Sequence, residues 1–79
     1  MHKFLFLVGP LTCAEEDLLA VYRGHESCPG VEGFEFELPE DFPGDLQETA
    51  IYIGRGWAFT EGWSIDNSVF TLISLGLSK

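Results

Sequence analysis

An unbroken apolar run near the start of the chain, from Phe4 to Val8, limits the folds that this sequence can adopt. Successive side chains of a strand point to opposite faces, so a strand that is apolar at every position needs a covering layer on both sides. Gly9 and Pro10 end the run. We therefore expect residues 3–8 to form a central strand that is covered on each face of its sheet.

The next segment carries the signals of a helix. Thr12 begins a capping box that ends at Glu15, and Glu15, Glu16 and Asp17 stand where the positive end of a helix attracts anions. Gly24 can adopt the left-handed conformation that ends a helix. This pattern predicts a helix near residues 13–24.

The remaining segments favour strands. Residues 33–38 alternate Phe34, Phe36 and Leu38 with two glutamates, which predicts a strand with one acidic face. Residues 45–49 are expected to form one short helical turn. Further strands are expected at 50–53, at 57–60 after a bulge at 54–56, at 63–65 and at 69–74.

Strands joined by short turns pair antiparallel. The sequence therefore predicts one α+β domain, residues 1–79, with one helix packed on a four- or five-stranded, mostly antiparallel sheet. A chain of 79 residues supports a single domain.

The start of the chain imitates a secretory signal, but Gly9 and Pro10 break its apolar run and no small-x-small cleavage site follows. No stretch reaches the roughly 20 apolar residues that a membrane span needs. We expect a protein of the host-cell cytoplasm with no membrane partner.

Cys13 and Cys28 are the only cysteines. They form either a disulfide or two reduced thiols, and the sequence does not decide between these states. A zinc site with His25 and His2 is a weaker alternative, because paired C-x-x-C motifs are absent.

Nothing in the sequence provides a catalytic set. His2 and His25 are the only histidines, and no third group is identifiable that would orient either of them against a nucleophile. Gly54-Arg55-Gly56 does not complete a phosphate-binding glycine motif, because Phe59 occupies the third glycine position. We expect no enzyme activity, no catalytic residue, no metal and no cofactor.

Charge is the most unusual property of the chain. Four basic side chains stand against 13 acidic ones, which gives a formal net charge of −9, and 11 of the acids fall between positions 15 and 48. If this part of the chain lies on one side of the fold, it forms a negative face. The residues that we expect to bind a partner are Glu15, Glu16, Asp17, Glu32, Glu35, Glu37, Glu40 and Asp41.

Such a face has two interpretations. It either serves solubility alone or docks on a basic protein surface. On a strand, Glu35 and Glu37 would project to the same side about 6.6 Å apart, which is on the order of the spacing of successive phosphates in a nucleic-acid strand. Carboxylates held in this way would occupy a groove of Lys and Arg, whereas direct binding to nucleic acid is disfavoured by repulsion from its phosphates.

Aromatic residues offer a second, independent surface. Trp57, Phe59 and Trp63 flank the predicted turn at residues 61–62. Trp57 and Trp63 are candidate anchors for a partner, Phe59 is a possible apolar contact beside them, and Tyr52 and Arg55 are further candidates. The alternative function is therefore a small structural or accessory module that binds a partner through exposed aromatics.

The acidic segment from Glu32 to Asp41, within a chain of this size, resembles the small acidic anti-CRISPR proteins of phages and mobile elements. The resemblance covers the whole chain in size, acidity and overall character. These proteins share no defining motif, so no functional residue is carried over. The resemblance implies a non-enzymatic inhibitor that docks on a basic CRISPR effector complex, of type I, and blocks DNA binding by DNA mimicry. We expect the protein to be a monomer.

Overall fold

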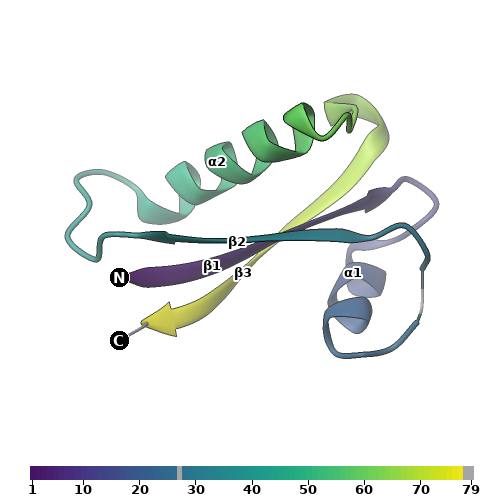
Figure 1. The fold of residues 1–79 in the computed structure, drawn as a ribbon, viewed down its shortest axis with the longest axis horizontal. Helices are drawn as coiled ribbons and strands as arrows, with labels where there is room; N and C mark the ends of the chain where they lie inside the picture. Colours follow the sequence, from purple (N-terminus) through teal and green to yellow (C-terminus); the bar gives the residue numbers. More distant parts are fainter. Residues whose placement is uncertain (27, 78–79) are drawn as a thin grey trace.

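The computed structural model describes residues 1–26 and 28–77. Its elements, in chain order, are β1 (His2–Pro10), α1 (Glu15–Tyr22), β2 (Glu32–Leu38), α2 (Leu46–Thr60), the short 3-10 helix η1 (Ile65–Asn67) and β3 (Ser68–Leu77). β1 pairs antiparallel with both other strands, so the sheet order is β2-β1-β3. Figure 1 shows α2 along one face of the sheet, and α1 on the other face at the end where β1 ends and β2 begins.

The prediction of a central first strand is confirmed. Phe4, Phe6 and Val8 are buried toward α2, where β2 and β3 add partly buried side chains to the same layer. Leu5 and Leu7 point to the opposite face and pack with Leu18 of α1. Because β1 is buried on both faces, it must lie in the middle of the sheet with a layer on each side.

A disulfide closes the layer that contains α1. Cys13, in the turn before α1, is bonded to Cys28, in the segment before β2, with their Cα atoms 6.1 Å apart. Cys13 is buried with Leu5, Leu7 and Leu18, so the bond lies beside this second core cluster. The sequence left this state open against reduced thiols.

The predicted numbers of strands and helices are wrong. The α+β class and the antiparallel pairing are present. Within the described residues, however, the sheet has three strands instead of four or five, and the chain forms two α-helices instead of one. The largest difference is at residues 46–60, where one continuous helix replaces a short turn and two strands. Residues 63–65 do not form a strand either, while the last strand is longer than the predicted 69–74.

The helix α2 has sequence signals that its β-branched and aromatic residues obscure. Asp45 is its N-cap, and its Oδ1 accepts a hydrogen bond of 3.0 Å from the Glu48 backbone N–H. Ala50, Gly54 and Ala58 are buried and recur every four residues, which is the spacing of one face of a helix. Small residues on this face let α2 approach the sheet closely.

The first helix is shorter than predicted and begins differently. It spans Glu15–Tyr22, its N-cap is Ala14 instead of Thr12, and the Asp17 carboxylate accepts a hydrogen bond of 2.8 Å from the Ala14 backbone N–H. Gly24 follows with a φ of +92°, which confirms its predicted role as the left-handed stop.

The two glycines of α2 predict opposite mutational effects. A Cβ on Gly54 would lie 2.1 Å from Cδ2 of the buried Phe6, whereas a Cβ on Gly56 would meet nothing within 4 Å. We expect Gly54→Ala to lower the free energy of unfolding by about 2 kcal/mol or more, because overpacking outweighs the gain in helix propensity. Gly56→Ala should instead raise it by up to about 1 kcal/mol. Urea unfolding of both variants checks this, and equal effects would contradict the packing of α2 on Phe6.

The disulfide predicts a redox effect on stability. Because the bond closes a loop of 15 residues in sequence separation, reduction should lower the free energy of unfolding by about 3 kcal/mol. Urea unfolding with and without a reductant measures the difference, with the Cys13→Ser/Cys28→Ser variant as control. The variant should match the reduced protein and be insensitive to the reductant; an unchanged unfolding midpoint on reduction would contradict the bond.

Candidate acidic interaction surface

The end of β2 and the turn after it present the densest group of predicted site residues. Phe34 and Phe36 point to the α2 layer, and Glu35 and Glu37 are exposed on the other face. This is the part of that face that α1, an eight-residue helix at the far end of the sheet, does not cover (Figure 1). Together with the exposed residues that follow β2, the group comprises Glu35, Glu37, Glu40 and Asp41, and we call it the β2 acidic surface.

Two cations lie at this surface. Lys3 Nζ is 3.6 Å from Glu35 Oε2, and the α-ammonium of Met1 donates a 2.7 Å hydrogen bond to Glu40 Oε1. The Met1 ammonium lowers the pKa of Glu40 below its ordinary value, through this hydrogen bond and through its charge. Both ion pairs lie on the exposed surface, where water and salt screen them.

The acids of α1 form a separate group. Glu15 Oε1 accepts a 3.1 Å hydrogen bond from the Thr71 hydroxyl of β3, Asp17 caps the helix, and Glu16 is exposed. β3 and β2 lie on opposite sides of β1, about 9.6 Å apart at the usual strand spacing. The eight predicted binding residues therefore do not form one cluster around β2, and several of them have structural roles.

The predicted aromatic anchors and Glu32 form another contact. Trp63 donates its indole N–H to the Glu32 carboxylate at the start of β2. The Trp57 ring stacks on Phe34 with ring centroids 5.1 Å apart. Both tryptophans are half-buried and pack against the cluster around Phe6. Their main contribution is to the packing between α2 and the sheet.

The outer side of α2 carries exposed aromatics instead. Tyr52 is 81% exposed and Phe59 is 71% exposed. With Arg55, Gly56 and Ile65 they line a shallow hollow of about 390 Å³. The sequence named Tyr52 as a further candidate and Phe59 as a possible apolar contact beside Trp57 and Trp63, but it expected a strand that places Phe59 on the same face as Trp57. Tyr52, Arg55, Gly56 and Phe59 are three or four residues apart, which is the spacing of one face of a helix and the signal that would have identified this surface. We call these four residues the exposed stripe of α2.

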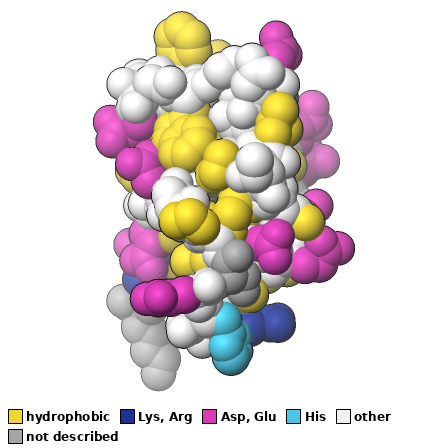
Figure 2. Space-filling model, turned by 90° about the vertical axis from the view of Figure 1, so that its right-hand side faces the viewer, with side chains coloured by type: hydrophobic (Ala, Val, Ile, Leu, Met, Phe, Trp, Pro, Cys, Tyr) yellow, Lys and Arg dark blue, Asp and Glu magenta, His cyan; other side chains and the backbone are white. Residues whose placement is uncertain are grey.

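The end of the molecule near the start of β2 has a mixed surface. Figure 2 shows hydrophobic side chains down the middle of this end, with acidic side chains along both margins. Leu11, in the turn that follows β1, is 58% exposed. An apolar centre with a charged rim is the usual composition of a protein-binding surface.

Other kinds of site have less support. In the described part of the chain, no three His, Cys, Asp or Glu side chains are grouped so that they could hold a metal ion. Among the same residues, no helix has the length and apolar character required to cross a membrane.

Comparison with known proteins gave no match, whether with family models, with curated proteins or with solved structures. The resemblance to anti-CRISPR proteins therefore stays a prediction from size and charge.

Proposed function

We propose that this protein is a non-enzymatic binding protein whose β2 acidic surface docks on a basic, nucleic-acid-binding surface of another protein. The observation that carries the proposal is the position of Glu35 and Glu37. They are exposed on the same face of a paired strand, on a part of the sheet that α1 and α2 leave uncovered (Figure 1). The strand backbone fixes the spacing of their Cβ atoms, so little loop ordering opposes binding.

The ion pairs at this surface do not prevent such docking. The Lys3 and Glu35 side chains are 40% and 54% exposed, and an exposed pair of this kind contributes about 0–1 kcal/mol. An Arg or Lys of a partner can replace Lys3 at a small free-energy cost. The net charge of −9 adds long-range attraction to any basic surface, and this attraction is screened by salt.

A more specific proposal concerns the identity of the partner protein. The resemblance to small acidic anti-CRISPR proteins favours a type I CRISPR effector complex, whose DNA-binding groove the carboxylates would occupy in place of phosphates. Because intracellular thiols are kept reduced, the protein would then act without its disulfide. Cys13 and Cys28 lie beside α1 instead of the β2 acidic surface, so reduction should leave the docking residues in place.

Charge reversal on the β2 acidic surface tests the proposal. The protein should inhibit DNA binding by a purified type I effector complex at low salt and lose potency at high salt. Glu35→Lys/Glu37→Lys should reduce the potency about tenfold or more, because the new charges repel the basic groove.

The matched control is Glu48→Lys/Glu61→Lys, which changes the net charge equally at two exposed positions, one in the first turn of α2 and one at its C-cap. It should weaken inhibition only by the small amount that net charge explains. An equal loss of potency in both variants would mean that inhibition depends on net charge alone. Inhibition that survives the reversal of Glu35 and Glu37 would exclude docking through the β2 acidic surface.

The exposed stripe of α2 supports a second candidate function, an accessory module that binds a partner through apolar contacts. A surface helix normally exposes polar residues, but Tyr52 and Phe59 project from this one on either side of Gly56. Within the described residues nothing would contact a Cβ at Gly56, so the fold itself does not require a glycine there. A glycine at this position would let a partner approach the helix backbone closely.

Substitution of the stripe separates the two candidates. Tyr52→Ala/Phe59→Ala should abolish binding that depends on this stripe, and such binding should change little with salt. It should leave salt-sensitive inhibition of the effector complex intact. Loss of both activities without loss of folding, measured by circular dichroism, would contradict the division of the molecule into two binding surfaces.

A further inference from the structure

The outer edge of β3 differs from the outer edge of β2. β3 pairs with β1 on one side, and among residues 1–26 and 28–77 no strand pairs with its other side. It has ten residues and no charged side chain, whereas the seven-residue β2 contains three glutamates. Exposed edges usually carry charges that prevent pairing with another chain. The β2 edge has this protection and the β3 edge lacks it.

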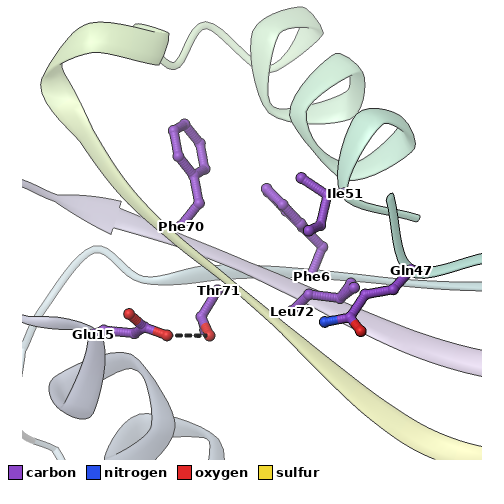
Figure 3. A pocket seen from close by; sticks show the side chains of 7 residues that line it. All are labelled: Phe6, Glu15, Gln47, Ile51, Phe70, Thr71 and Leu72. Carbon is purple, nitrogen blue, oxygen red and sulfur yellow. Dashed lines mark hydrogen bonds between the residues drawn. The ribbon is translucent and has the colours of Figure 1, made fainter. Parts of the chain in front are cut away.

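A groove runs along the β3 edge, lined mainly from the side of α2 and, at Glu15 and Thr71, from the opposite face. It contains two adjacent hollows of about 250 and 410 Å³, which share Gln47 of α2 and Leu72 of β3. Figure 3 shows Phe70 and Ile51 pointing into the first of them, near Phe6. A strand added to β3 would place every second side chain in this groove, as in strand-addition complexes.

The sequence of β3 fits a copy of itself in the antiparallel direction. Residues 68–74 read Ser-Val-Phe-Thr-Leu-Ile-Ser, which is nearly symmetric about Thr71. Pairing centred on Thr71 would set Phe70 opposite Leu72 of the other copy in the α2 layer. On the other face it would set Val69 opposite Ile73. Each apolar residue would thus face an apolar one, and Ser68 would face Ser74.

We propose that two copies of this chain pair through residues 68–74 of β3, about a two-fold axis at Thr71, and form a continuous six-stranded antiparallel sheet. The pairing of β3 with β1 has an irregularity between Lys3 and Phe4 of β1, which follows Ser74 in β3. Residues 68–74 end before it, so the segment that we propose to pair is a regular strand. The two-fold axis makes the contact self-complementary and closed, so it stops at a dimer. This inference does not depend on the proposed function, and it differs from the monomer that we expected from the sequence.

Charge limits the strength of the dimer. Each copy carries −9, and Glu15, held by the Thr71 hydroxyl on the face away from α2, is the acid closest to the axis (Figure 3). Added salt screens this repulsion, so self-association should strengthen as salt rises. Docking on a basic partner should weaken under the same change, and the two interactions are therefore distinguishable.

Sedimentation equilibrium tests the pairing and its register. The mass of the full chain should rise from 8.8 kDa toward twice that value with concentration, and further with added salt. Ser68→Glu/Ser74→Glu should give a monomer, because like charges would face each other twice across the seam. Ser68→Glu/Ser74→Lys should still dimerise, since the same two positions then carry opposite charges.

The two variants replace the same serines and both lose the hydrogen bond between Ser74 and His2, so they differ only in the sign of the charge at position 74. A chain that stays at 8.8 kDa under all conditions overturns the proposal. A dimer that both variants keep, or that both lose while remaining folded, overturns the register centred on Thr71.

Discussion

The close approach of Phe6 to α2 at Gly54 fixes the helix on the sheet, and the surface of the molecule depends on this contact. With Ala50, Gly54 and Ala58 against the sheet, the opposite side of the helix must carry Tyr52 and Phe59 outward. The same contact holds residues 46–60 in a helix, so they do not add strands to the sheet. β3 is therefore left as an edge.

The central position of β1 gives the two edges their different chemistry. β2 carries Glu35 and Glu37 on the face that α1 leaves open, and β3 is uncharged along its whole length. One edge is suited to a basic partner and the other to an uncharged strand. The two interactions respond to salt in opposite directions, because one is an attraction between unlike charges and the other must overcome repulsion between like charges.

Much of the fold was predictable from local patterns. The apolar run at Phe4–Val8 and the alternation at residues 33–38 identified β1 and β2, and Gly24 identified the end of α1. The helix α2 was missed because Ile51, Tyr52, Ile53 and Trp57 favour strands, and two glycines in six residues disfavour a helix. Tertiary packing on Phe6 overrides these preferences, and the sequence does not reveal which residue Gly54 meets.

The candidate site was predictable in part for related reasons. Period-two alternation placed Glu35 and Glu37 on an exposed face, as the structure has them. The alternation could not show that α1 begins beside β3, on the far side of β1 from β2. This position separates Glu15, Glu16 and Asp17 from the β2 acidic surface. Nor could the alternation show that Trp63 would bind Glu32, because that contact joins residues 31 positions apart.

Residue-resolved amide hydrogen exchange, at a concentration low enough to keep the protein monomeric, tests the central claim most directly. If α2 lies on a three-stranded sheet and β3 is an edge, all amides of residues 4–8 in β1 should exchange slowly. Those of β3 should alternate between slow and fast, because only alternate N–H groups face β1. Slow exchange at every position of β3 in the monomer would mean that another strand covers its outer side, and would contradict this account.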